Sequence, residues 1–164
     1  MVTLLLKEIN GFLNSLIGYI VMVVFITLIG LFMWLFSGNF NVLDSGYANM
    51  DSLFVIAPWV FLFLVPAITM RSFAEEFRAG TIELLSTKPL TAWHIVLAKF
   101  LAGWLLVIIA LLPTLIYYFT IGSLGLPAWN VDDGAIWGSY VGIVFLSGAY
   151  VAIGVFASSL SVNQ

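Results

Sequence analysis

The sequence lacks cysteine, has a single histidine and carries few charges. Without cysteine, the chain can form no disulfide bond, thiol redox centre or thiolate metal site. One histidine, His94, cannot supply the pair of histidines that an HExxH zinc site needs. Lys and Arg number 5 against 8 Asp and Glu, which gives a formal net charge of -3 and a pI near 4.7. Because phosphate binding needs clustered Lys and Arg, this balance argues against a nucleic acid partner.

Apolar residues dominate instead. They make up 63% of the chain, charged residues make up 8%, and the mean hydropathy is +1.16, which is incompatible with an ordinary soluble domain. Apolar runs of about 20 residues cross a bilayer as helices, because backbone groups must satisfy one another inside hydrocarbon. Four such runs occur, at residues 16–36, 53–70, 95–121 and 135–157. The sequence therefore predicts an all-α fold, a polytopic transmembrane helix bundle with four spans in one domain, residues 1–164.

The segment before the first run is amphipathic. Apolar side chains recur there at helical spacing, and the remaining positions form a polar stripe. The apolar set is Leu5, Leu6, Ile9, Phe12, Leu13 and Leu16, and the polar set is Thr3, Lys7, Asn10 and Asn14. We expect an N-terminal helix lying in the membrane interface, with an irregular inner end of the first span as the alternative.

The positive charges orient the chain, because all of them fall on one side of a four-span arrangement. They are Lys7, Arg71, Arg78, Lys88 and Lys99. The loops on the other side, residues 37–52 and 122–134, carry four aspartates and no Lys or Arg. The positive-inside rule then places both termini in the cytoplasm. Lys99 lies near the inner end of the third span, where its side chain can snorkel to the interface.

Prolines and small residues within the spans indicate shape and packing. The prolines, each of which favours a kink, are Pro58, Pro66 and Pro113. Gly138 and Gly142 have the GxxxG spacing, and Gly148 and Ala152 repeat that separation. Small residues at this spacing let helices approach closely. We interpret the kinks as shape rather than hinges, and the small residues as packing within the chain, with a dimer interface as the alternative.

The spans contain no candidate catalytic or ion-coupling residues. They hold no Asp, Glu, Arg or His at mid-membrane depth, which argues against an ion-driven transporter and against an intramembrane protease. His94 lies at the inner boundary, where a capping or interfacial role is expected rather than catalysis. No G-x-x-x-x-G-K-[ST] phosphate loop occurs, so the chain cannot hydrolyse ATP alone. We therefore predict no catalytic, cofactor or metal site on this chain.

The polar segment 71–93 separates the second and third runs and is the most informative part of the sequence. Three of the 5 basic residues and three of the 8 acids lie in it. Apolar side chains also occur in this charged loop, at Ile82, Leu84, Leu85 and Leu90. An exposed apolar patch there favours docking of a soluble partner. The alternative is a solvated loop held by weak surface ion pairs.

Turn and cap residues divide the polar segment into short helices. Ser72 and Glu75 fit a capping box, and Gly80 is expected to end that helix in a left-handed turn. Thr81 is expected to cap a second short helix, which Pro89 stops. Thr91 is then the expected cap of the third span.

Two stretches of this region resemble a known family. They are E-E-F-R-A-G-T-I-E-L-L-S-T-K-P-L at 75–90 and W-H-I-V-L-A-K-F at 93–100. There the sequence resembles the permease subunits of type-2 ABC exporters, specifically the gliding-motility-associated permease found with a separate ATPase. The resemblance covers essentially the whole chain. It implies that residues 81–90 form a coupling helix that inserts into a groove of the ATPase, with Glu75, Glu76 and Arg78 bracing its approach. The implied docking residues are Glu75, Glu76, Arg78, Gly80, Thr81, Ile82, Glu83, Leu84, Leu85, Pro89 and Leu90.

The resemblance also implies a setting. The chain would be a multi-pass protein of the bacterial plasma membrane, and its partners would be an ABC ATPase that binds ATP and Mg and a second permease subunit, in a homodimer or heterodimer. The family usually has six spans, so we expect that the chain is incomplete at its C-terminus. A non-transporting scaffold that recruits a soluble partner through the same loop is the alternative function. Nothing in the spans identifies a substrate.

Overall fold

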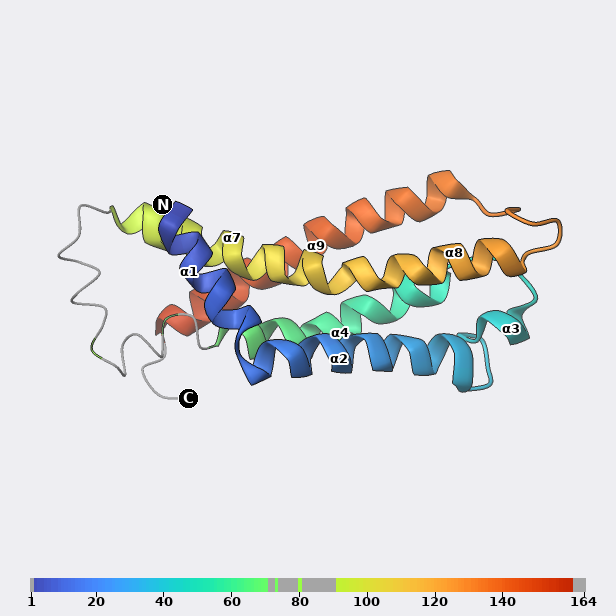
Figure 1. Cartoon of the computed structure of the whole chain (residues 1–164), viewed down its shortest axis with the longest axis horizontal. Helices are drawn as coiled ribbons and strands as arrows, with labels where there is room; N and C mark the ends of the chain where they lie inside the picture. Colours follow the sequence, from blue (N-terminus) through green and yellow to red (C-terminus); the bar gives the residue numbers. More distant parts are fainter. Residues whose placement is uncertain (1, 71–72, 74–79, 81–90, 161–164) are drawn as a thin grey trace.

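The computed structural model describes residues 2–70, 73, 80 and 91–160, apart from the side chains of residues 17 and 92. Within these residues the chain is helical and contains no strand. The helices form one elongated bundle (Figure 1). Four of its helical segments are long and apolar enough to cross a membrane, namely Gly18–Leu35, Asp51–Thr69, Trp93–Leu124 and Asp133–Leu160. The four predicted spans are therefore confirmed.

The described helices follow one another along the bundle. In chain order they are α1 (Val2–Leu13), α2 (Leu16–Gly30), the π-helical turn η1 (Leu31–Leu35), α3 (Val42–Ser45), α4 (Asp51–Thr69), α7 (Ala92–Leu111), the 3-10 turn η2 (Leu112–Thr114), α8 (Leu115–Leu124) and α9 (Asp133–Leu160). The predicted N-terminal helix is present as α1, which is separate from the first span. Its location in the membrane interface stays a prediction.

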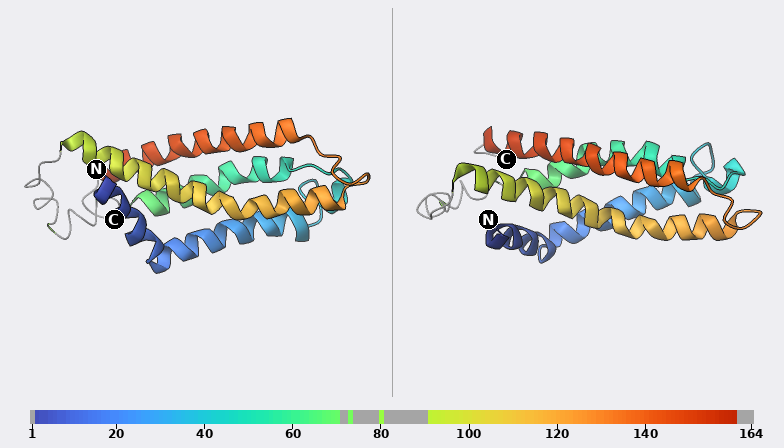
Figure 2. Two further views of the ribbon diagram at one scale, coloured as in Figure 1. Left: turned by 45° about the horizontal axis from the view of Figure 1, so that its top comes forward. Right: turned by 90° about the horizontal axis from the view of Figure 1, so that it is seen from above.

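The two ends of the bundle differ in what they carry (Figures 1 and 2). At one end, called the terminal end below, lie α1, the last turn of α4, the first turn of α7 and the last turn of α9. At the other end, the distal end, lie α3 and the connection between α8 and α9. The polar segment 71–93 starts and finishes at the terminal end.

Ser15 produces the corner between α1 and α2. Its hydroxyl oxygen accepts a hydrogen bond from the Gly18 amide at 3.1 Å, which caps α2, and donates to the carbonyl oxygen of Phe12 at 2.7 Å. Gly18 lies directly against the Phe12 carbonyl group, where a Cβ atom would collide with backbone. The chain can therefore turn this sharply only with glycine at position 18.

Glycines bring α4, α7 and α9 into close contact. A Cβ atom at Gly154 on α9 would lie 2.9 Å from Thr69 Cβ on α4 and closer still to its hydroxyl oxygen. Gly148, also on α9, lies under the indole ring of Trp104, whose Nε1 donates to the carbonyl oxygen of Val144 at 2.9 Å. Small residues serve here as they do generally in membrane helices, by letting larger neighbours approach the backbone.

The GxxxG prediction is wrong in its main pair. No atom lies within 4 Å of the position of a Cβ atom on Gly138 or Gly142, so neither glycine packs within the chain. Ala152 is likewise exposed, whereas Gly148 is buried against Trp104 as expected. The physical reason is helical phase, because α9 buries the face that carries Ile136, Tyr140 and Ile143 and turns the GxxxG pair outward.

Proline affects the spans unequally. Pro113 lies in the 3-10 turn η2, which joins α7 to α8 as one bent span, while Pro58 and Pro66 lie inside the continuous helix α4. Thr114 in η2 is fully buried, and its hydroxyl group makes hydrogen bonds at this irregular turn. Its hydroxyl donates to the carbonyl oxygen of Leu111 at 2.6 Å and shares a 3.0 Å hydrogen bond with the Tyr140 hydroxyl. Irregular backbone is tolerated at membrane depth when it is satisfied in this way.

The close contact at Gly154 yields a test of the packing. Gly154→Ala should destabilise the bundle by about 1–3 kcal/mol, because the added methyl group overlaps Thr69 on a neighbouring helix. Gly142→Ala is the matched control, since it makes the same chemical change on the same helix in open space. Unfolding in detergent micelles measures both. Equal stability of the two variants would contradict the packing described here.

Candidate functional site

The predicted docking residues fall mostly outside the described part of the chain. Of that set the structure describes Gly80 alone. The residues outside the described part are Glu75, Glu76, Arg78, Thr81, Ile82, Glu83, Leu84, Leu85, Pro89 and Leu90. Ser72 and the two predicted short helices also lie outside the described residues. Gly80 has a φ of 65°, the left-handed conformation expected at this position. The site can therefore be built from the places where the polar segment joins the bundle.

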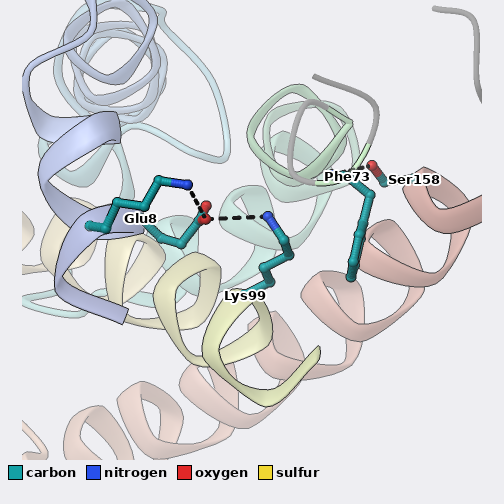
Figure 3. Close-up of polar contacts among 5 residues, drawn as sticks. Glu8, Phe73, Lys99 and Ser158 are labelled. Carbon is teal, nitrogen blue, oxygen red and sulfur yellow. Dashed lines mark hydrogen bonds and ion pairs between the residues drawn. The ribbon is translucent and has the colours of Figure 1, made fainter. Parts of the chain in front are cut away.

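Phe73 fixes the start of the polar segment to α9. Its side chain is buried, and its backbone amide donates to the hydroxyl oxygen of Ser158 at 3.2 Å (Figure 3). The same hydroxyl group donates to the carbonyl oxygen of Met70 at 2.8 Å. Ser158 thus bridges two backbone groups just beyond the end of α4. The beginning of the segment is held at a defined place on the bundle.

Lys99 on α7 lies at the centre of this junction. Its side chain is 0% exposed, and its ammonium nitrogen donates to Glu8 Oε1 on α1 at 3.2 Å (Figure 3). The same nitrogen lies 4.9 Å from the centre of the Phe73 ring, within range of a cation–π interaction. The prediction that Lys99 snorkels to the interface is therefore wrong. The ammonium group is neutralised inside the protein, because α1 folds over α7 and supplies the carboxylate.

Burial decides which of the two ion pairs of Glu8 matters. Lys7 lies 3.9 Å from the Glu8 carboxylate, but its side chain is 62% exposed, so water screens that pair. Lys99 has no such access to water, and removing the partner of a buried charge is costly. The four residues Glu8, Lys99, Phe73 and Ser158 therefore join α1, α7, the polar segment and α9. They are called the junction below.

Sequence reasoning did not identify three members of the junction. The available signal for Glu8 is that it is the only acid before the first span while Lys99 is a lysine within a long apolar run, a combination that indicates a buried pair. Phe73 is an aromatic residue in a charged segment, which was a weaker signal. Ser158 carried none, because a serine near the end of an apolar helix commonly bonds only to its own backbone.

At the other end of the polar segment, Thr91 is the N-cap residue of α7, as predicted. Its hydroxyl group pairs with Nδ1 of His94 at 2.9 Å rather than with a backbone amide. His94 is exposed and interacts with the cap, which agrees with a capping role. Within the described residues, no three His, Cys, Asp or Glu side chains gather where a metal ion could bind.

Comparison with protein families gives one match. Residues 36–164 match the family model described as "ABC-2 family transporter protein". The match begins at the end of the first span and includes the polar segment and the three later spans. Comparisons with curated proteins and with solved structures found no match.

The buried ion pair makes a stability prediction. Glu8→Leu should cost about 3 kcal/mol, because it takes a carboxylate away from an ammonium group that is shielded from water. Lys99→Met in the Glu8→Leu background should recover part of that loss, since the buried charge is then gone. Lys7→Met is the control and should change stability less than Glu8→Leu does, because the Lys7 side chain is 62% exposed and water screens its pair with Glu8. Unfolding in micelles measures all three, and a double variant no more stable than Glu8→Leu would count against the pair.

Proposed function

Since this chain belongs to the ABC-2 family of transporter proteins, we propose that its polar segment 71–93 is the surface on which a separate ABC ATPase docks and drives transport. As a member of the family, the chain is a permease, the non-catalytic, membrane-spanning component of an ABC transporter, and a multi-pass membrane protein. We further propose its docking role, its partners and the direction of transport.

The junction is the observation that carries this proposal. The polar segment leaves α4 at Met70, where Phe73 is tied to α9 through Ser158 and lies under the ammonium group of Lys99 on α7. Lys99 in turn holds α1 through Glu8. A push on the segment would therefore be transmitted to three helices at once, rather than being absorbed by a loose loop.

The mechanism follows from this connection. Two permease subunits form the pathway, and two ATPase subunits bind ATP and Mg and close on one another. Their closure pushes on residues 81–90, which lie in a groove of the ATPase, while Glu75, Glu76 and Arg78 brace the approach. The spans then switch between inward and outward access, and the catalytic groups all belong to the partner. The chain lies in a bacterial plasma membrane, with the terminal end of the bundle on the cytoplasmic side. The resemblance to the gliding-motility permease favours export to the cell surface.

The docking surface can be tested by co-purification with the cognate ATPase. Replacing Glu83, Leu84 and Leu85 by Ala should weaken association by at least about tenfold and abolish stimulation of ATP turnover, because truncating central apolar contacts costs more than about 1 kcal/mol each. A matched control replaces three exposed apolar residues of the distal end, Leu43, Tyr47 and Leu126, by Ala. Association and stimulation that survive the first set would overturn the proposal. Association without any stimulation by the unmodified chain would favour a scaffold.

Orientation has its own test, which exploits the absence of cysteine from the chain. A Ser86→Cys variant should react with a membrane-impermeant maleimide only after cells are opened, because residue 86 lies in the polar segment. A Tyr47→Cys variant, at an exposed distal position, should react in intact cells. The reverse pattern would place the polar segment outside the cell, where no ATPase could reach it.

A further inference from the structure

A pocket of about 590 Å³ lies at the distal end of the bundle and is called the distal pocket below. One wall comes from α3 and the residues that follow it, and the other comes from the end of α8 and the loop beyond it (Figure 1). The volume falls within the range of about 300–1,000 Å³ that is typical of ligand sites. Its lining contains both apolar side chains and side-chain amides, so it differs from a gap between two lipid-facing helices.

The distal pocket has an apolar floor and an open rim. Val42 and Ile121 belong to the lining and are buried, whereas Leu126 in the same lining is 95% exposed. The two walls meet at Ala48 and Gly125, where a Cβ atom on the glycine would lie 3.3 Å from the Ala48 Cβ atom. A ligand can therefore bury an apolar group on the floor while its polar group stays near the rim.

The amides of the lining offer hydrogen-bond acceptors. The Asn49 side-chain nitrogen donates to Asp51 Oδ2 at 2.9 Å, which leaves Asn49 Oδ1 without a hydrogen bond among the described residues. The Asn130 side chain likewise makes no hydrogen bond within the described part of the chain. Hydrogen bonds polarise one another, so an amide that donates to a carboxylate accepts more strongly at its oxygen. The pocket therefore favours a ligand that donates hydrogen bonds.

The charges around the distal pocket have one sign. The two connections that form it carry no Lys, Arg or His, and their four aspartates are Asp44, Asp51, Asp132 and Asp133. Of these, Asp51 is bound directly to a lining residue, Asn49. A field of one sign raises the local concentration of ions of opposite charge and lowers that of like ions. A cation is therefore favoured in this pocket, and an anion is disfavoured.

We propose that the distal pocket binds a protonated amine that carries an apolar group. The ammonium group donates to Asn49 Oδ1, close to the carboxylate of Asp51, and the apolar group lies on Val42 and Ile121. Donor, charge and apolar surface are all needed for this recognition. The site lies at the opposite end of the bundle from the polar segment and is independent of where an ATPase docks.

Protection of an introduced thiol tests the site, because the chain has no cysteine of its own. Leu126→Cys places a thiol in the lining, and Ser123→Cys places one at an exposed position outside it. The full chain is held in lipid nanodiscs and treated with methyl methanethiosulfonate, a neutral thiol reagent. At millimolar concentration, 2-phenylethylamine should slow the reaction at position 126 at least about threefold and leave that at position 123 unchanged.

Two further probes isolate the charge of the ligand. Both keep the phenylethyl group of the amine, but 2-phenylethanol is uncharged and 3-phenylpropionate is an anion. At equal ionic strength the amine should protect position 126 at the lowest concentration, the alcohol should protect it less, and the anion should not protect it.

A pair of aspartate variants isolates the contribution of the lining. Asp51→Asn removes the charge but keeps an oxygen that can accept from Asn49, so with Leu126→Cys it should raise the half-protecting concentration of the amine at least about threefold. Asp133→Asn is the matched control and should have a smaller effect, because that carboxylate binds the Tyr118 hydroxyl group, outside the lining. Asn49→Ala removes the acceptor and serves as the second variant if Asp51→Asn does not fold.

Several outcomes would overturn the proposal. Equal protection by the three probes would mean that the pocket recognises only the apolar group, and better protection by the anion would contradict the argument from charge. Slowing at position 123 equal to that at position 126 would make the effect a general one. Equal effects of the Asp51 and Asp133 variants would separate the Asn49–Asp51 pair from the site. Loss of ATPase binding with retained protection leaves this proposal intact and contradicts only the docking proposal.

Discussion

An ammonium group that is shielded from water inside a membrane bundle has to be neutralised by the protein, and this constraint organises the terminal end. Lys99 is such a group, and within the described part of the chain a carboxylate is supplied to it by Glu8, 91 residues earlier. The pair holds α1 against α7, with Leu4 and Ala98 packed beside it. The ring of Phe73 also lies against the ammonium group. The position of α1 and the start of the polar segment therefore depend on one charge.

Close packing acts on the other helices and divides the bundle into two parts. Gly154 and Gly148 bring α9 against α4 and α7, so these three helices interlock where a methyl group would not fit. The first span makes no glycine contact of this kind with α4, and an apolar groove lies between them, lined from Ile20 to Phe32 on the first span and from Val55 to Ala67 on α4. One side of the bundle is thus fixed by backbone proximity. The other is shaped by rings and branched side chains.

Local signals carried the sequence prediction, and contacts between distant segments limited it. The spans, the helix α1, the cap at Thr91 and the left-handed Gly80 follow from runs, periodicity and turn residues, all of which act over a few positions. The GxxxG pair and Lys99 failed for a different reason. Which face of α9 meets α4, and whether a carboxylate reaches a buried lysine, depend on how the helices pack. The groove depends on the same packing, so no motif marks it, and the docking residues remain a prediction.

The two ends of the bundle also differ in the range of their polar contacts, and this difference has a mechanical meaning. At the distal end three aspartates bind groups within six residues: Asp44 accepts from the Gly38 amide, Asp51 from the Asn49 side chain and Asp132 from the Ala135 amide. The fourth, Asp133 at the start of α9, accepts from the Tyr118 hydroxyl of α8 at 2.7 Å and so joins two helices that are neighbours in the chain. At the terminal end, the bonds between Glu8 and Lys99 and between Phe73 and Ser158 join residues 91 and 85 positions apart. A displacement applied at Phe73 is therefore passed to α1, α7 and α9 together, whereas the aspartates of the distal end connect segments that are at most 15 residues apart in the chain.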